Sequence, residues 1–244
     1  MLHRDAAPGI HRLAIAATNL YLVEVDDRVL LVDAGLPAAW RPLHEALHAI
    51  GRTPDDLAGV LLTHGHFDHV GLARRIAERW SVPVWSHPAD VRLARHPYGY
   101  LHERARLPYP VLHPTAIPGL VAMTAAGALT VRGVEARPID DDVPLPADAR
   151  ILEVPGHTDG SIAIHLPERD ALLTGDALVT LDPYTGVRGP QIVAGAATAR
   201  SAVALDSLDA LAATGATRVL TGHGPGWRGG IDRAVEAARR RGAH

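Results

Sequence analysis

The chain reads Thr63-His64-Gly65-His66-Phe67-Asp68-His69 directly after the apolar run 57–62, Leu-Ala-Gly-Val-Leu-Leu. A run of this length and composition predicts a buried strand. If the backbone stays extended past Thr63, His64 and His66 point to the same face, because strand side chains alternate. Asp68 is then expected to cap a helix over residues 69–80, which turns Asp68 and His69 toward the same place. Since imidazole and carboxylate groups are good ligands for zinc and similar metals, the stretch predicts a site for one metal ion or two.

Some histidines of this chain are expected to stand close together by chance, because it contains 15 of them. His44 and His48 stand at helical spacing and are expected to be ordinary surface residues. A His-x-His-x-Asp-His run directly behind a strand is far more demanding than such a pair. The metal site is therefore the favoured interpretation.

The motif resembles the signature of the metallo-β-lactamase-fold hydrolases, and four further segments resemble motifs of that family in the same order. Val32-Asp33-Ala34-Gly35 resembles the strand-end Asp-x-Gly that buttresses the site. The family's third-histidine loop, bridging-aspartate turn and last-histidine loop are matched in turn by Pro155-Gly156-His157-Thr158-Asp159-Gly160-Ser161, Leu173-Thr174-Gly175-Asp176-Ala177 and Thr221-Gly222-His223-Gly224-Pro225. The resemblance extends from about residue 10 to residue 230.

The resemblance implies a dinuclear site for two divalent metal ions, with zinc expected and iron or manganese as alternatives. Seven residues match the family's metal ligands: His64, His66 and His157 for one ion, Asp68, His69 and His223 for the second, and Asp176 as the bridge between them. The residues themselves agree with this division, because the last three ligands each follow a plausible strand, at 151–154, 171–174 and 218–220. Glycines beside these ligands allow sharp turns, and ligands of open α/β sheets gather at the carboxyl ends of strands.

Composition sets the outer bounds of the fold and of the chemistry. A chain of 244 residues that is 47% hydrophobic supports one large domain or two smaller ones. No linker divides it, so a single domain over residues 1–244 is expected. The absence of cysteine excludes disulfides, thiolate metal sites and a cysteine nucleophile. All 24 basic residues are arginine, which excludes a lysine general base and Schiff-base chemistry.

The charge pattern bears on partners and location. The net charge is −3 and the arginines are scattered along the sequence, so no nucleic-acid partner is expected. The run Arg239-Arg240-Arg241 is better explained as cations at the carboxyl end of a terminal helix than as a phosphate contact. No signal peptide and no apolar stretch of about 20 residues is evident. A cytoplasmic protein without a membrane partner follows, with secretion lacking a classical signal as an alternative; a monomer and a homodimer are both open.

The coarse pattern of the chain predicts two similar halves. In the first, strands are expected at 10–16, 20–25, 28–33, 57–62 and 82–85, with helices at 37–50 and 69–80. In the second, strands are expected at 133–139, 150–154, 161–166, 170–175 and 218–221, with helices at 197–213 and from 231 onward. This mixture predicts a layered α/β (α+β) arrangement. The resemblance sharpens it to the four-layer αβ/βα sandwich, with two mixed β-sheets flanked by helices and the metals at one edge.

A segment between the halves, about 87–127, is rich in proline and is expected to form a long connection without regular structure. Such connections are commonly lids or binding loops, and the resemblance implies that insertions here cover the metals and select the substrate. Tyr98, Tyr100 and Tyr109 are therefore candidate substrate contacts, with a packed surface excursion as the alternative. In the segment after Asp176, Tyr184 is a candidate hydrogen-bond partner of a substrate oxygen and Arg188 of a carboxylate. A turn aromatic and a surface arginine explain these two equally well.

The resemblance implies hydrolysis by a hydroxide that bridges the metals, formed from a water whose pKa is lowered to about 7. Asp68 is the candidate catalytic residue that accepts and relays a proton. Asp176 argues against penicillins, because the zinc β-lactamases of this motif type generally lack the bridging aspartate. The quorum-quenching lactonases usually have a tyrosine shortly after the bridging aspartate, whereas in this chain Asp176 is followed by Ala177. The substrate classes that remain are esters, lactones and thioesters of small molecules. A mononuclear iron persulfide dioxygenase and a non-catalytic binding protein are the alternatives.

Overall fold

The computed structural model describes all residues from Met1 to His244, and they fall into two compact units. Unit 1 comprises Met1–Gly99 and Met123–Ala147, and unit 2 comprises Tyr100–Ala122 and Asp148–His244. The expected insertion is thus divided between the units. A single domain over residues 1–244 with a lid at about 87–127 stays a prediction.

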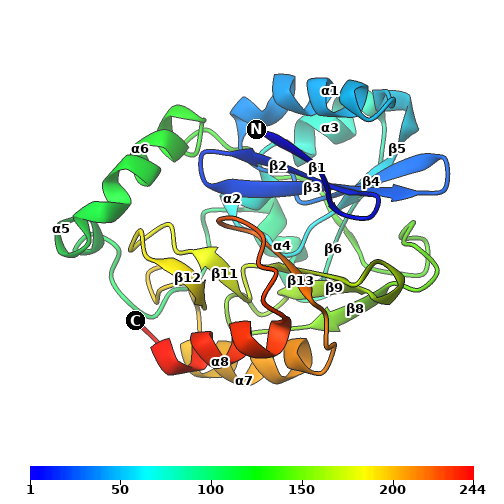
Figure 1. The fold of residues 1–244 in the computed structure, drawn as a ribbon. Coiled ribbons are helices and arrows are strands. Elements are labelled where there is room, and N and C mark those ends of the chain that lie inside the picture. The colour runs from blue at the N-terminus through cyan, green and yellow to red at the C-terminus, as the bar shows by residue number, and fades with distance from the viewer. The chain divides into compact units, whose positions relative to one another are not determined.

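Unit 1 is built on a seven-stranded sheet whose strands follow one another in chain order (Figure 1). The first four strands pair antiparallel and the last four, which share β4, pair parallel. β2 and β3 are joined through Ala16 and Ala17, both with positive φ, which is the hairpin geometry that follows the twist of the strands. The strands are β1 (Leu2–Ala7), β2 (Ile10–Ile15), β3 (Thr18–Val25), β4 (Arg28–Val32), β5 (Leu57–Leu61), β6 (Val84–Ser86) and β7 (Arg137–Pro138).

Two helices of unit 1 cover one face of this sheet, α1 (Trp40–Ala49) and α3 (Ala73–Trp80) (Figure 1). Leu43 and Leu47 of α1 and Ile76 of α3 are fully buried against Leu22 and Leu31 of the sheet. Each such side chain stabilises the fold by about 1.5–3 kcal/mol relative to exposure. The shorter helices of the unit are α2 (Phe67–Val70) and α4 (Val91–Arg95), with 3₁₀ turns at Pro37–Ala39, Pro54–Asp56 and Pro88–Asp90.

Unit 2 contains a four-stranded sheet in the order β13-β10-β9-β8 and a separate two-stranded sheet of β11 and β12. Two helices, α7 (Ser201–Ala212) and α8 (Ile231–Arg241), bury Leu208 and Val235 in a core with Leu172 and Val219 of the larger sheet. The strands are β8 (Arg150–Glu153), β9 (Ile162–Leu166), β10 (Ala171–Gly175), β11 (Val179–Leu181), β12 (Arg188–Gln191) and β13 (Arg218–Thr221).

The mixed α/β fold class predicted from the sequence is confirmed, and most core elements lie within two residues of their predicted bounds. Three strands were not predicted, β1, β11 and β12, and the expected strand at 133–139 is reduced to the two residues of β7. Every strand of the two larger sheets that borders a metal motif was predicted. No helix of the structure combines the length and the hydropathy that a membrane span requires.

The helix expected over residues 69–80 is interrupted, and Asp68 does not cap it. Asp68 lies instead in the first turn of α2, whose N-cap is His66. The interruption arises at Gly71, where a Cβ atom would lie 2.1 Å from the backbone oxygen of Gly35. Around it, Ala34 donates its N–H to the His69 oxygen at 2.7 Å and accepts from the Leu72 N–H at 3.3 Å. These bonds to the end of β4 replace the bonds that a continuous helix would make.

The expectation that residues 87–127 lack regular structure was wrong. The segment holds α4, α5 (Tyr109–Leu112) and α6 (Ile117–Ala125), with further 3₁₀ turns at Pro88–Asp90 and Pro114–Ala116. Three of its six prolines stand in the first turns of short helical elements, at Pro88, Pro110 and Pro114. Proline is favoured there because its fixed φ suits a helix and the first N–H groups have no intrahelical partner. The proline content thus indicated helix starts rather than an irregular loop.

A histidine-aspartate pair ties the last residues of unit 2 to its centre. Asp182 is fully buried, and its Oδ2 accepts from the Ala194 N–H and from His244 Nε2, each at 2.9 Å. The hydrogen bond to Asp182 raises the pKa of His244 above its usual value of 6.5, against the opposing effects of burial and of Arg241. Because the pKa is raised in the folded state, the stabilisation is complete below about pH 6.5 and is lost as the pH rises through the folded-state pKa.

We expect His244→Ala to lower the free energy of unfolding by about 1–2 kcal/mol at pH 6 and by less at pH 9, because the charged hydrogen bond to Asp182 is removed. Urea denaturation of the variant and the wild type at both pH values measures this difference. His102→Ala, which removes an exposed imidazole of the same unit, is the matched control. A loss of stability that is equal at pH 6 and pH 9 would contradict the assignment.

Candidate metal centre

The motif behind β5 brings three imidazoles of unit 1 together. His64, His66 and His69 are buried, with exposed fractions of 1%, 3% and 0%. The ring of His64 lies 4.7 Å from that of His66 and 4.2 Å from that of His69, measured between centroids. Asp68 joins them, with Oδ2 at 3.9 Å from His69 Nε2. The four residues therefore lie close together. Strand alternation predicted this for His64 and His66, whereas Asp68 and His69 reach the same place from α2 and not through a cap at Asp68.

Asp33 fixes this segment to the end of β4. It has a left-handed backbone (φ +61°), which aspartate tolerates better than most residues. Its Oδ1 accepts from the Thr63 N–H at 2.8 Å, and its Oδ2 lies 2.8 Å from His69 Nδ1. A carboxylate can only accept here, so His69 carries its proton on Nδ1 and its lone pair on Nε2. Asp33 therefore orients a candidate ligand through Nδ1 and leaves Nε2 as the nitrogen that could bind a metal.

Thr63 fixes the tautomer of His64 by the same logic. Its hydroxyl donates to the Asp33 carboxylate, with oxygen distances of 3.0 and 2.8 Å. A hydroxyl has one proton to donate, so Thr63 Oγ1 accepts from His64 Nδ1, which lies 3.1 Å away. His64 is thus protonated on Nδ1, and its Nε2 carries the lone pair that a metal ion requires.

Asp90 is a supporting residue that the sequence did not reveal. It is 1% exposed, and its Oδ2 accepts from the Gly65 N–H at 2.8 Å. This bond holds the backbone between the two histidines of the motif. Close packing reinforces it, because a Cβ atom at Gly65 would lie 2.7 Å from the Ala94 nitrogen. The one sequence signal for Asp90 is its place shortly after the end of β6, the next parallel strand of the sheet.

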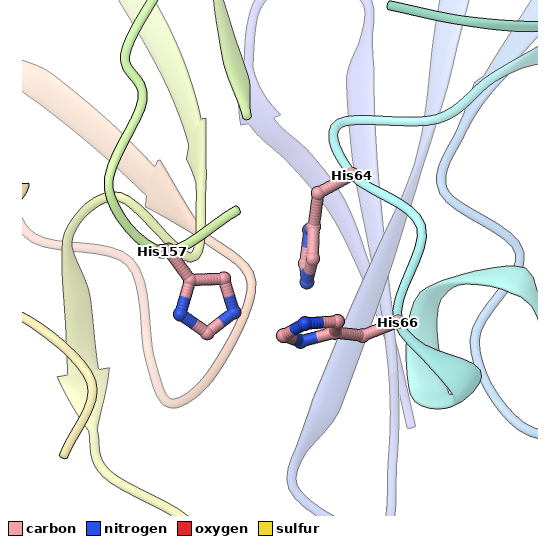
Figure 2. Close-up of side chains that lie close together, drawn as sticks. All are labelled: His64, His66 and His157. Carbon is pink, nitrogen blue, oxygen red and sulfur yellow. The ribbon is translucent and has the colours of Figure 1, made fainter. Parts of the chain in front are cut away.

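His157 is positioned in unit 2, on the loop that follows β8. Its Nδ1 lies 3.2 Å from Thr198 Oγ1, and that hydroxyl donates to the Val193 oxygen at 2.7 Å. Because its only proton is directed at a carbonyl, Thr198 accepts from His157 Nδ1–H, and the His157 lone pair is on Nε2. Thr198 lies 41 residues from His157 and was not a sequence candidate. Figure 2 labels the three candidate ligands of the first ion, His64 and His66 on the segment after β5 and His157 on the loop after β8.

Asp176 and His223 lie at the ends of two parallel neighbours, β10 and β13. Carboxyl ends of adjacent parallel strands meet at one edge of a sheet, which places the two side chains together. Asp176 Oδ2 lies 3.1 Å from His223 Nε2 and 3.5 Å from His157 Nε2. All three residues are at most 5% exposed. Within unit 2, the carboxylate predicted to be a bridge therefore lies between the two histidines.

Tyr98 is the one candidate substrate contact in unit 1. Its hydroxyl donates to the Ala128 oxygen and accepts from the Val131 N–H, both at 2.8 Å. Its ring stacks on Phe67 with centroids 5.4 Å apart, and Phe67 directly precedes Asp68. The side chain is 43% exposed, so Tyr98 has a surface beside the motif while its hydroxyl is engaged by the backbone.

The other candidate tyrosines lie in unit 2 and contact one another. The hydroxyls of Tyr100 and Tyr184 are 2.9 Å apart, and the ring of Tyr109 meets that of Tyr184 edge-on at 6.1 Å. Arg106 stacks over Tyr100 at 4.0 Å from the ring centre. Arg188 is exposed at the start of β12, and its backbone oxygen accepts from Arg241. Tyr100, Tyr109 and Tyr184 thus form one aromatic cluster, separate from the contacts of Arg188.

Comparisons with known proteins place both units in one family. The sequence model of the metallo-beta-lactamase superfamily matches residues 15–223. Probable metallo-hydrolase YflN of Bacillus subtilis (strain 168) is 32% identical over 187 residues, which cover 73% of this chain and 67% of the relative. The crystal structure of TTHA1623 in a di-iron-bound form has a TM-score of 0.62 and 27% identity, and the match covers 93% and 95% of the two chains. The metallo-beta-lactamase family protein TTHA1429 from Thermus thermophilus has a TM-score of 0.65 and 28% identity, with 96% and 79% covered.

We expect Thr63→Val to weaken both the fold and metal binding, because the change removes the acceptor of His64 Nδ1–H at nearly constant volume. The loss of stability should be about 1–3 kcal/mol, and metal affinity should fall about 10–100-fold, as is usual when the support of a ligand is lost. Chemical denaturation and metal titration measure the two effects. Thr63→Ser keeps the hydroxyl and should behave as wild type; the assignment fails if valine and serine give the same affinity.

Proposed function

The chain belongs to the metallo-beta-lactamase superfamily and is a metal-dependent hydrolase, and we propose that it cleaves an ester, lactone or thioester bond with two divalent metal ions. Seven motif residues would hold the ions: His64, His66 and His157 the first, Asp68, His69 and His223 the second, and Asp176 both. The proposal extends to a small-molecule substrate and to action in the cytoplasm, as a monomer or homodimer.

The observation that carries this proposal is the fixed tautomer of three histidines. Asp33 engages Nδ1 of His69, Thr63 that of His64, and Thr198 that of His157. In all three rings the lone pair is therefore on Nε2, the form in which a neutral imidazole binds a metal. A neutral imidazole can carry its proton on either ring nitrogen, so an ordinary buried histidine does not need one particular tautomer. The same tautomer, arranged in two separate units, is what a metal site requires of its ligands.

The chemistry divides between the ions and the chain. When bound, two such ions lower the pKa of a water between them and polarise the oxygen of the bond to be cleaved. The residues supply the ligand field and a proton acceptor. Asp68 is our candidate for that acceptor, at Oδ2, since it stands in the first turn of α2 and beside His69 Nε2.

We propose zinc as the metal, with iron and manganese as the alternatives. Histidine and carboxylate ligands suit all three ions, and the TTHA1623 structure is of a di-iron form. Metal analysis of the purified protein decides between them. One equivalent of iron together with oxygen consumption would instead indicate a persulfide dioxygenase.

The substrate is proposed to carry an apolar group next to the bond that is cleaved. Support comes from the part of the insertion that lies in unit 2, where Leu101, Leu107, Val111 and Leu112 are 69–91% exposed. The hydroxyl pair of Tyr100 and Tyr184 adds hydrogen-bonding capacity within the same unit. A panel of p-nitrophenyl esters, lactones, thioesters and phosphodiesters, assayed on metal-loaded protein, tests the class. Turnover of phosphodiesters alone would refute it.

We expect His66→Ala and His157→Ala each to abolish hydrolysis, because each removes one ligand of the proposed first ion. Both variants should stay folded by circular dichroism and contain less metal by elemental analysis. His87→Ala, which removes a histidine outside the motifs, is the control and should keep its metal. Full activity in either ligand variant would show that the first ion is bound elsewhere.

We expect Asp176→Ala to reduce the metal content from two ions toward one per chain, since its carboxylate is the one ligand proposed to touch both. Isothermal titration of the metal-depleted protein with zinc measures the stoichiometry. Asp159→Ala, which removes an exposed carboxylate of unit 2 that pairs with Arg200, should still bind two ions. Two ions at wild-type affinity in the Asp176 variant would reduce that residue to a turn position.

A further inference from the structure

A cavity of about 320 Å³ opens on unit 1 along helix α3. Arg74, Arg75, Glu78 and Arg79 of α3 line one side of it, and Arg132 and Thr130 line another. None of these residues belongs to a metal motif. The volume lies at the lower end of the range for small-molecule sites in proteins.

The lining is strongly basic although the chain as a whole is acidic. Four guanidinium groups and one carboxylate give the cavity a net charge of +3, whereas the net charge of the chain is −3. In the sequence the arginines looked scattered, because Arg132 stands far along the chain from the three arginines of α3. The fold gathers them at one place, where like charges repel one another unless an anion is bound.

Two of the arginines are held in place by neighbours. The Arg75 guanidinium lies 3.9 Å above the centre of the Trp40 ring, and Arg74 Nε donates to Glu78 Oε1 at 2.8 Å. Arg79 and Arg132, in contrast, make no ion pair or side-chain hydrogen bond in the structure. The cavity thus combines oriented guanidinium groups with two whose five donors each are available to a ligand.

The backbone at the cavity contributes positive electrostatic potential, as the arginine side chains do. Gly71 and Leu72, which also line it, directly precede the first residue of α3. The first N–H groups of a helix have no intrahelical acceptor, and the helix dipole places positive potential at this end. Anions are favoured at such a position, and here the helix end adds to the four arginines.

We propose that this cavity binds a compact phosphate-type anion that carries at least two negative charges. Guanidinium forks match the oxygens of phosphate in pairs, and a single charge would leave most of the basic lining uncompensated. A nucleic acid is a poorer match, because the basic residues line one small cavity rather than an extended stripe. The site is independent of the hydrolytic function, since it uses no residue of the metal motifs.

Calorimetric titration of the metal-loaded protein with inorganic pyrophosphate at low ionic strength tests the proposal. We expect Arg79→Ala combined with Arg132→Ala to weaken binding at least tenfold. The matched control is Arg92→Ala combined with Arg137→Ala, which removes two arginines of unit 1 outside the cavity and should change affinity less than twofold. Glu78→Gln removes the one carboxylate of the lining and should tighten binding several-fold, so the test does not depend on one variant being folded.

Four results would overturn the proposal. Wild-type protein that does not bind pyrophosphate has no such site. Equal affinity in the wild type and the cavity variant would place the anion elsewhere, including at the metal ions. Equal weakening in the cavity variant and the control would reduce binding to a general effect of charge. Succinate that binds as tightly as pyrophosphate would exclude phosphate as the ligand class.

Discussion

The candidate metal ligands of unit 1 depend on the hydrogen bonds that the carboxylate of Asp33 accepts. This carboxylate receives a backbone N–H and a hydroxyl from Thr63 and a ring nitrogen from His69, residues 30 and 36 positions further along the chain. A buried carboxylate costs several kcal/mol in desolvation, which only multiple donors offset. The same three bonds that satisfy Asp33 also set the position and the tautomer of two candidate ligands. A substitution that breaks these hydrogen bonds is therefore expected to change both the stability of the fold and the geometry of the candidate ligands.

The candidate ligands were predictable from the sequence because their signals are local. A buried strand, a turn with glycine and a histidine or aspartate occur together within a few residues, as at His64 and Asp176, and the resemblance to a family then relates these segments to one another. The residues that orient the ligands have no such signal. Thr198 and Asp90 act through single hydrogen bonds to partners 41 and 25 residues away, and one threonine or aspartate in a loop is unremarkable by itself.

The insertion was the least predictable part because its composition admits two interpretations. Prolines and tyrosines between 87 and 127 suggested an irregular lid, yet several of the prolines begin short helical elements and the segment is anchored in specific places. Glu103 accepts from the N–H and, at 2.6 Å, from the hydroxyl of Ser201 at the start of α7. The Thr115 hydroxyl donates to the Thr185 oxygen at 2.8 Å. The part of the insertion in unit 2 is thus a fixed segment that leaves apolar side chains exposed.

The interleaving of the two units along the chain has a consequence for synthesis on the ribosome. Residues of unit 1 are complete once Ala147 has been made, whereas unit 2 begins with Tyr100–Ala122 and continues only from Asp148. The hydrogen-bond partners of this early segment are synthesised much later. Ser201 lies 98 residues after its partner Glu103. The backbone oxygen of His244 accepts from the Tyr109 hydroxyl, and His244 lies 135 residues after Tyr109. Domains tend to fold as they emerge. In the nascent chain, the apolar segment of unit 2 therefore stays exposed after unit 1 has folded. A chaperone that binds this segment would protect it while the stretch from Asp148 to Ser201 is being synthesised.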